Sequence, residues 1–457
     1  MKPLLLLLIL LLAGGAPAPV AAQGCGGGDD DESVLEGDDE EESKLEEGLE
    51  EEEERDAAGH KVRRKDDGSD PGAPKLKRSL QERVNAAIEA GVEALKKLQR
   101  PDGSWGPITG VPYGDRSKPE FDAHFSGPTS FAVYTLSKCG VRKSDPAIKK
   151  GYRWLRKKYR KTQIWSGAGN SGQKKGAMGT YEVASLLLML EAMHEKSAKL
   201  TGRHSRRTLQ TDNPRKKPTR SRFPNDDWFW LHQATVYITN GKQGGRGLTF
   251  KGCQNPNGGW RYGQAKGDVD MSATQFALLG LRAASQAGYP VKPRVWKWAL
   301  AGVREFQKSH GGFSYKKNMG WSASMDACAL GSMIICKEQL ELAGSIAPHW
   351  VDESIARAMK HHDTVFDVQP NKGTHDGGSY HYYYLYSVER IGDLTGRKEF
   401  GGKDWYVRGA EFLLAHQQAD GRWVDSTCIK PRDTLGTCFA LLFLKKATMP
   451  AVTLSEG

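Results

Sequence analysis

The segment C-Q-N-P-N-G-G-W-R-Y, Cys253 to Tyr262, decides the fold because variants of it recur along the chain. The other copies are L-Q-R-P-D-G-S-W at 98–105, F-Q-K-S-H-G-G-F at 306–313 and H-Q-Q-A-D-G-R-W at 416–423. Their final aromatic residues are 155, 53 and 110 residues apart, at Trp105, Trp260, Phe313 and Trp423. These intervals are close to three, one and two copies of a unit of about 52 to 55 residues, which indicates a repeat architecture.

Each repeat predicts two helices joined by a glycine-aromatic turn. The glutamine ends an amphipathic stretch, and the Asp/Asn-Gly pair then turns the chain, since glycine tolerates positive φ. A second stretch follows that is apolar nearly all round, as in Thr274-Gln-Phe-Ala-Leu-Leu-Gly-Leu, and similar stretches begin at Thr129 and Thr437. This pattern is typical of a helix buried on every side. We therefore expect an outer amphipathic helix and an inner buried helix in each unit.

Two further units lack the full phrase. One runs through Trp154 to the apolar segment 181–193, and the other runs from Trp350 to the segment 381–391. The six expected units are 80–138, 147–196, 226–286, 293–336, 350–391 and 404–447. Because one repeat cannot bury its apolar face alone, we expect six helical hairpins to close into an all-α (α/α)6 toroid, with six inner helices inside six outer ones.

The N-terminal segment has the pattern of an export signal. Met1 to Ala22 holds an early lysine, an apolar run from Leu4 to Leu12 and small residues before Ala22. This pattern is typical of a signal peptide, and its apolar part is too short for a membrane span. We expect cleavage after Ala22 and an exported protein, in the periplasm, in the cell envelope or secreted. The alternative is a lipoprotein signal with a lipid anchor on Cys25, which would add peripheral membrane association.

Charge divides the rest of the chain. Residues 29–54 contain 17 acidic residues and one lysine, against a net charge of +11 for the whole chain. Like charge without aromatic residues predicts a disordered tether over 23–78. We expect the toroid over 79–448, with a basic, proline-interrupted loop inserted at 199–225, and a tail over 449–457. The other basic residues are dispersed and match no nucleic-acid-binding module, so nucleic acid is not an expected partner.

The Q-x-x-D/N-G-x-W phrases, with the apolar helices that follow them, resemble the repeats of the terpenoid cyclase and protein prenyltransferase superfamily over about 79–448. The resemblance implies the double ring of helices and a central cavity that binds isoprenoid chains. It does not fix an activity, since sites are grafted onto folds. It implies an exported toroid that binds an apolar or isoprenoid-like ligand, with or without a retained enzymatic activity. The sequence indicates no oligomeric state.

Similarity to squalene-hopene-type cyclases, which are isomerases, implies a first site. Those enzymes carry D-x-D-D-T at the start of an inner helix, and Asp268-Val-Asp270-Met-Ser272 stands at the corresponding place. Asp270 would protonate an alkene in a dry pocket, with Asp268 as its neighbour. The departure is Met271 in place of the last aspartate. The alternative is that Asp270 or Ser272 caps the inner helix through free backbone N–H groups.

Similarity to the prenyltransferase β subunit implies a second site. That family binds zinc through an Asp-x-Cys pair and a later histidine, which would here be Asp326, Cys328 and His381. Such a site would activate a thiol substrate. Export argues against it, because thiols are prone to oxidation outside the cytoplasm. The alternative is that Cys328 is core, Asp326 a polar wall residue and His381 a hydrogen-bonded helix start. No other cofactor is expected.

The densest polar-aromatic patch lies at 375–384, where unit five turns into its inner helix. Converging acids, histidine and tyrosines at one end of a cavity describe a ligand site, and tyrosines at helical spacing are alternatively ordinary core. The expected cavity residues are Tyr380, His381, Tyr382, Tyr383, Glu182, Tyr262 and Tyr315. A third use of the same architecture is carbohydrate cleavage, as in toroidal lyases and glycosidases, although no carboxylate pair stands out.

Overall fold

The computed structural model describes residues 79–106, 123–159, 179–194, 223–239, 254–261, 269–373, 379–426 and 431–446. The expected export signal, acidic tether and tail, and nearly all of the basic loop, lie outside these residues. So do Asp268 and Tyr262. Within the described residues, no helix is both long enough and apolar enough to cross a membrane.

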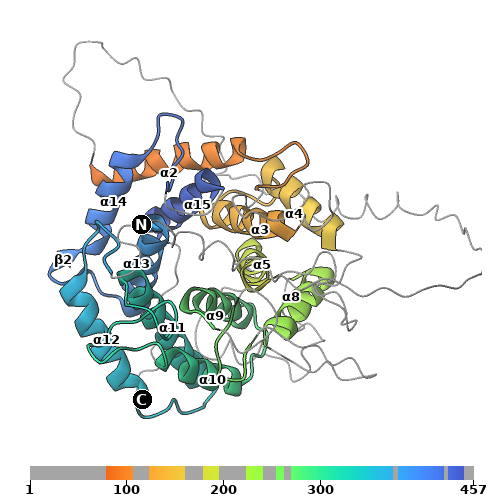
Figure 1. The fold of residues 1–457 in the computed structure, drawn as a ribbon. Coiled ribbons are helices and arrows are strands. Elements are labelled where there is room, and N and C mark those ends of the chain that lie inside the picture. The colour runs from red at the N-terminus through yellow and green to blue at the C-terminus, as the bar shows by residue number, and fades with distance from the viewer. Residues whose placement is uncertain are drawn as a thin grey trace, which may run out of the picture. The chain divides into compact units, whose positions relative to one another are not determined.

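The described residues form two layers of α-helices (Figure 1). The outer helices are α2 (Leu80–Lys97), α4 (Pro146–Tyr159), α8 (Asn225–Ile238), α10 (Pro293–Arg304), α12 (Val351–Val365) and α14 (Trp405–His416). The inner helices are α3 (Ala123–Lys138), α5 (Thr180–Met193), α9 (Met271–Gln286), α11 (Ala323–Leu342), α13 (His381–Thr395) and α15 (Arg432–Lys445). Two short antiparallel strands, β1 (Glu399–Phe400) and β2 (Lys403–Asp404), lie between α13 and α14.

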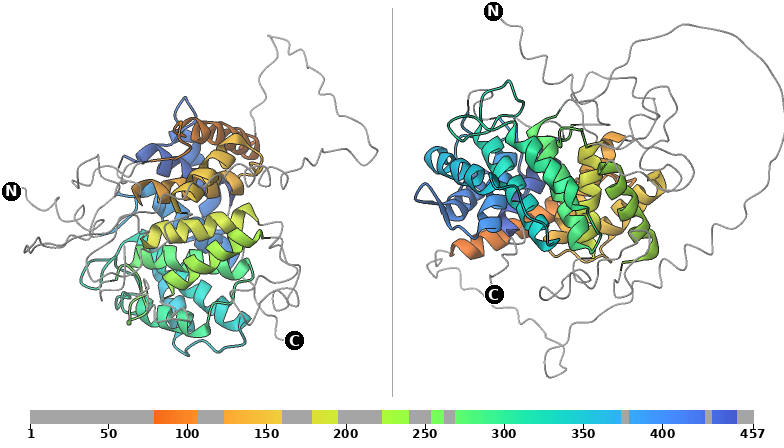
Figure 2. Two further views of the ribbon diagram at one scale, coloured as in Figure 1. Left: turned by 90° about the vertical axis from the view of Figure 1, so that its right-hand side faces the viewer. Right: turned by 90° about the horizontal axis from the view of Figure 1, so that it is seen from below.

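The inner helices close into a ring. Each inner helix packs against the next one in chain order, and the last, α15, packs against the first, α3. The outer helix α2 also contacts α14 and α15, so that the first and last units meet in both layers. Figure 2 shows the helices of the two layers lying side by side. The expected all-α double ring is therefore confirmed.

Burial separates the two layers as the apolar patterns predict. Every residue of α5 from Val183 to Met193 is buried, whereas α10 buries one face. The largest boundary difference is at α11, which continues to Leu342 rather than ending at 336. Its last two turns bury Glu338, Gln339 and Leu340, and polar residues at these positions hid the continuation in the sequence.

The glutamine of the recurrent phrase connects each turn to the next outer helix. Gln254 Nε2 donates to the carbonyl of Gly258 at 3.0 Å and to that of Val295, on α10, at 3.2 Å. The glutamines of units one, four and six make the same pair of bonds, and their partners on the next outer helix are Ala147, Ser354 and Ala87. Since Gln417 of unit six bonds to Ala87 on α2, the repeat's own hydrogen bond closes the ring.

The aromatic end of the phrase holds the two helices of one unit together. Trp260 Nε1 donates to the carbonyl of Ile238 at 2.8 Å, and its backbone N–H donates to Thr274 Oγ1 at 3.1 Å. Trp105 and Trp423 make the same two bonds in units one and six. Gly258, with φ of 96°, lies so close to the carbonyl of Trp298 that a Cβ would stand 1.7 Å from its oxygen. This turn therefore requires glycine.

Candidate ligand site

Aromatic side chains from four inner helices meet at the centre of the ring. The ring of Phe131, on α3, lies 6.0 Å from Phe276 on α9, 6.2 Å from Tyr386 on α13 and 5.3 Å from Phe439 on α15. Tyr386 also lies 6.5 Å from Phe276 and 5.2 Å from Phe439. Because α3, α9 and α13 are not neighbours, these contacts cross the centre. This aromatic layer fills the ring at its level, where the sequence predicted an open cavity.

A buried polar cluster of Gln275, Cys328, Tyr383 and Ser387 adjoins the aromatic layer. The Tyr383 hydroxyl donates to Gln275 Oε1 at 2.7 Å and lies 2.9 Å from Cys328 Sγ. The Tyr383 ring stacks on Phe276 with a centroid distance of 6.2 Å. Burial raises the pKa of Cys328 to about 12 and the pKa of Tyr383 well above its usual value. Both groups are therefore protonated at neutral pH, and Cys328 is a poor nucleophile.

Tyr181 and Ser272, in the first turns of α5 and α9, lie beside this cluster, and Glu182 follows Tyr181 on α5 and lies against Gly127 of α3. The Tyr181 hydroxyl is 2.8 Å from Ser272 Oγ, and the Tyr181 ring is 5.0 Å from Phe276. Burial raises the pKa of Glu182 to about 7 against opposing hydrogen bonds from two backbone N–H groups. Tyr181, Glu182, Ser272 and Tyr383, with the aromatic layer beneath them, form the candidate ligand site at the end of the ring where the inner helices begin.

Asp270 is the N-cap of α9. Its Oδ1 accepts a hydrogen bond from the backbone N–H of Ala273 at 2.7 Å, and its Oδ2 accepts one from Arg261 Nη1 at 3.2 Å. The carboxylate is fully buried. Both partners stabilise its charged form, whereas a donor of protons to an alkene has to be protonated. These contacts match the capping alternative.

The structure does not bring Asp326, Cys328 and His381 together. Asp326 accepts from the backbone N–H of Phe313, while Cys328 faces Tyr383. The second oxygen of Asp326 lies 2.8 Å from His361 Nδ1, so the carboxylate and the Cys328 thiol are held by different partners. The His381 ring packs against Phe412 of α14 at 4.7 Å. Among the described residues, no group of three or more His, Cys, Asp or Glu side chains is placed to hold a metal, so the zinc alternative does not fit.

The tyrosines expected to line the cavity in unit five lie on different faces of α13, because of the helical periodicity. Tyr383 and Tyr386 are three residues apart and share the face towards the centre. Tyr382, about 100° away, lies 6.3 Å from Phe412, and its backbone N–H donates to Asp425 at 3.2 Å. Tyr380 is the left-handed residue before α13, with φ of 56°.

Tyr315 is another of the expected cavity residues. Its backbone carbonyl accepts a hydrogen bond from the N–H of Met271 at 3.0 Å. Tyr383 and Glu182 are thus the expected residues that belong to the candidate site. The remaining members of the site were not predicted from the sequence, although the sequence does contain a signal for the aromatic layer. In units one, three and six a phenylalanine follows two residues after the threonine of the inner helix, at Phe131, Phe276 and Phe439.

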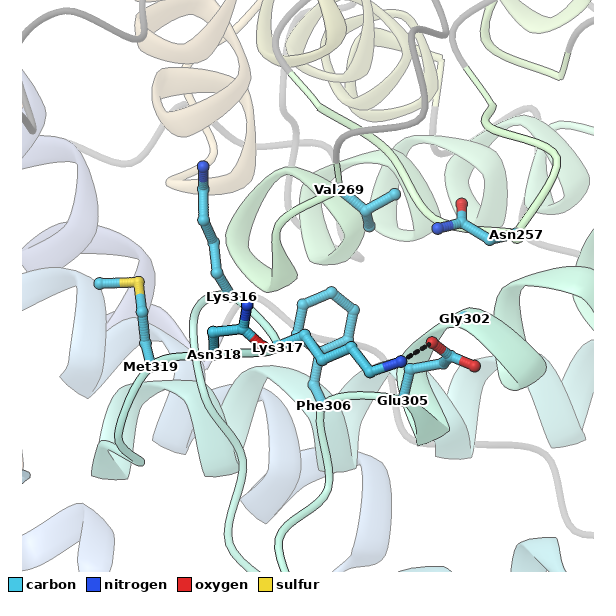
Figure 3. Close-up of a pocket in the computed structure, with 9 residues that line it drawn as sticks. All are labelled: Asn257, Val269, Gly302, Glu305, Phe306, Lys316, Lys317, Asn318 and Met319. Atoms are coloured by element: carbon cyan, nitrogen blue, oxygen red, sulfur yellow. Dashed lines mark hydrogen bonds and ion pairs between the residues drawn. The ribbon is translucent and has the colours of Figure 1, made fainter.

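A separate pocket of about 380 Å³ lies beside the end of α10 (Figure 3). Lys317 reaches across it to Glu305, with 2.9 Å between Nζ and Oε2. Both side chains of this pair are more than half exposed. The pocket shares no residue with the candidate ligand site. Its lining is Asn257, Val269, Gly302, Glu305, Phe306, Lys316, Lys317, Asn318 and Met319.

No family model matches the sequence, and no curated protein is similar to it. Among solved structures, the fold is similar to the type II terpene cyclase MstE from Scytonema, with TM-score 0.46, 10% identity and coverage of 80% of this chain and 97% of the other. For a possible GH105 family member from Salmonella enterica serovar Paratyphi A, the TM-score is 0.48 and the identity 12%, with 82% of this chain and 95% of the other covered. For the GH76A α-1,6-mannanase of Salegentibacter sp. HEL1_6, the TM-score is 0.46 and the identity 9%, with 80% of this chain and 98% of the other covered. At these values the likeness assigns neither a family nor an activity.

Proposed function

We propose that this protein is an exported toroid that binds an apolar or isoprenoid-like ligand at the candidate ligand site. The observation that carries the proposal is the aromatic layer that crosses the ring, with hydroxyl and carboxyl groups on one side of it. Aromatic faces offer a large apolar surface, and a few convergent polar groups fix the orientation of a ligand. Tyr181, Ser272 and Tyr383 would hold a polar end group, and Phe276 would contact the apolar part.

Binding without cyclisation is the form of this function that the chemistry favours. Protonating an unactivated alkene requires a strongly acidic donor in a dry site. Burial raises the pKa of Glu182 to about 7, which makes it a weaker acid than an ordinary carboxyl group. Asp270 is held by Ala273 and Arg261. Neither carboxyl group therefore suits the first step of a cyclase.

Carbohydrate cleavage finds less support, because it needs two carboxyl groups flanking the scissile bond. Glu182 would be the first of them. The carboxylates in or next to the first turns of α9, α11 and α15 are each paired with a basic side chain. These pairs are Asp270–Arg261, Asp326–His361 and Asp433–Arg422.

Lipid extraction of the purified full-length protein, followed by mass spectrometry, tests for a co-purifying apolar ligand. Titration with geranylgeraniol, followed by intrinsic fluorescence, then measures affinity. Tyr383→Phe should weaken binding by about fivefold through one lost hydrogen bond. Tyr382→Phe is the matched control, since its ring lies at Phe412 and outside the candidate site. Equal affinity in the two variants, or binding of maltoheptaose but not geranylgeraniol, would contradict the proposal.

Two further measurements address the alternatives. Incubation with squalene and geranylgeranyl diphosphate should give no cyclic product, and a product that disappears in Asp270→Asn would establish a cyclase instead. N-terminal sequencing of the protein recovered from its native cells tests export, with Gln23 expected as the first residue.

A further inference from the structure

The six outer helices occupy equivalent places in the ring but differ in charge. The sequence of α4 contains six basic residues and no acidic one, namely Lys149, Lys150, Arg153, Arg156, Lys157 and Lys158. In α2, α8, α12 and α14 the acidic residues equal or outnumber Lys and Arg, and α10 carries three basic residues without an acidic one. The charge on α4 is therefore a local feature rather than a property of the outer layer.

Four of these side chains form one stripe along α4. At 100° per residue, Lys149, Lys150, Arg153 and Lys157 fall within an arc of about 100° and span about 12 Å along the axis. Lys150, Arg153 and Lys157 are exposed, and Lys149 is half-buried. The opposite face buries Trp154 and Leu155 against the ring. We call these four residues the α4 stripe; Figure 1 shows α4 on the outside of the ring.

The α4 stripe is not neutralised within the part of the chain that the structure describes. None of its four residues forms an ion pair or hydrogen bond with another side chain there. By contrast, the neighbouring Arg156 turns inward and pairs with Asp227 of α8. On α10, the other basic helix, Arg294 and Arg304 lie over Trp298 and Trp350 at 5.7 Å and 4.6 Å.

We propose that the α4 stripe docks the protein on an anionic lipid surface. Four flexible cationic side chains in line suit a surface of diffuse phosphate charge, where each Lys or Arg strengthens partitioning by about fivefold. The exposed large apolar residues of the described part are on other segments, at Phe229, Trp298, Ile346, Val407 and Val424. The contact is thus electrostatic, without insertion of side chains. Among the side chains of α4 that the structure describes, Tyr152 is half-buried and Trp154 is buried. Neither offers the exposed ring on which a nucleic-acid base stacks, which favours lipid over nucleic acid.

Co-sedimentation of the full chain with phosphatidylcholine vesicles, with and without phosphatidylglycerol, tests the proposal. Binding should require phosphatidylglycerol and weaken as salt is added. The triple variant Lys150→Gln, Arg153→Gln, Lys157→Gln should lower the partition coefficient by about 100-fold. Because these side chains are exposed, its melting temperature should match that of the parent.

The control variant removes the same charge from three separate helices, through Lys97→Gln on α2, Lys360→Gln on α12 and Arg408→Gln on α14. These residues are also exposed and without ion pairs in the described part. The control should lose less than about fivefold, because its three charges come singly from separate helices and form no stripe. If the partition coefficient fell equally in the two variants, net charge rather than the α4 stripe would account for vesicle binding, and the proposal would be overturned. If the triple variant retained vesicle binding but lost binding to heparin, the α4 stripe would be a site for a soluble polyanion. That result would also overturn the proposal.

Discussion

In units one, three and six, a threonine of the inner helix accepts a hydrogen bond from the backbone N–H of the tryptophan in the turn. In unit four, Asp326 accepts the corresponding hydrogen bond from the backbone N–H of Phe313. The second oxygen of Asp326 lies 2.8 Å from Nδ1 of His361 on the next outer helix, α12. The ring of His361 in turn lies 4.5 Å from His310 and 4.9 Å from Trp321. One turn geometry is thus built from neutral hydrogen bonds in three units and around a buried ionisable pair in the fourth.

The repeat therefore constrains the shape of its turn more than the chemistry of the contact. Phe313 has no indole N–H, so unit four lacks the bond that Trp260 makes to the end of its outer helix. Asp326 supplies instead a link between α11 and α12. Burial raises the pKa of Asp326, while His361 and the Phe313 N–H oppose the shift. Unit four is consequently the turn with its own pH dependence.

The largest effect is expected from the turn glycines. In Gly258→Ala the new Cβ would stand 1.7 Å from the carbonyl oxygen of Trp298, and in Gly311→Ala it would stand 2.5 Å from that of Arg357. Both residues also have positive φ. Gly258→Ala should lower the free energy of unfolding by about 4 kcal/mol, and Gly311→Ala by about 2 kcal/mol. Urea unfolding measures both values, and equal losses would show that the two turns are equally tight.

An intermediate effect is expected when unit three is given the aromatic residue of unit four. Trp260→Phe removes the hydrogen bond to Ile238 and leaves part of the buried indole volume empty. The free energy of unfolding should fall by about 2 kcal/mol. Phe306→Leu, which removes buried aromatic volume but no side-chain hydrogen bond, serves as the packing control. A loss of less than about 0.5 kcal/mol for Trp260→Phe would mean that the indole bond contributes little.

The smallest effect is expected from Asp326→Thr, which gives unit four the contact of the other three. The raised pKa of Asp326 means that the folded state holds this proton more tightly than the unfolded state. Its contribution to stability is therefore present below the ordinary carboxyl pKa and is lost as pH rises through the raised value. Parent stability should thus fall across that window, and the variant should lack this component.

Unfolding curves at a series of pH values provide the measurement. Asp433→Asn is the matched control, since Asp433 pairs with Arg422 at a half-buried site in unit six. An unchanged pH profile in Asp326→Thr would mean that other groups account for the dependence.

The sequence predicted the ring because its determinants are local and repeated. The Gln-to-Trp phrase fixes each turn through hydrogen bonds within a few residues. The apolar helices can bury all their faces only when the ring closes. The filled centre was harder to foresee. It depends on which residues of separate helices converge, and Phe131, Phe276 and Phe439 resemble ordinary core until the ring is assembled.

The expected metal and cavity residues show a second reason for the differences. The Asp-x-Cys motif groups Asp326 with Cys328, although the two side chains have different hydrogen-bond partners. The sequence likewise groups Tyr382 with Tyr383, although helical periodicity directs them to α14 and to the centre respectively. The contact between Asp326 and His361 spans 35 residues and two helices, and no motif in the sequence signals it.

The bond from Gln417 to Ala87 also bears on how the chain could be rearranged. It makes the junction between the last unit and the first equivalent to three junctions inside the chain, so the closing contact is built in the same way as internal ones. Joining the two ends of the helical region and cutting between any other pair of units should preserve every such junction. A circularly permuted chain would then reach the same architecture, whereas deletion of a whole unit would leave a gap that the remaining five could not span without new contacts.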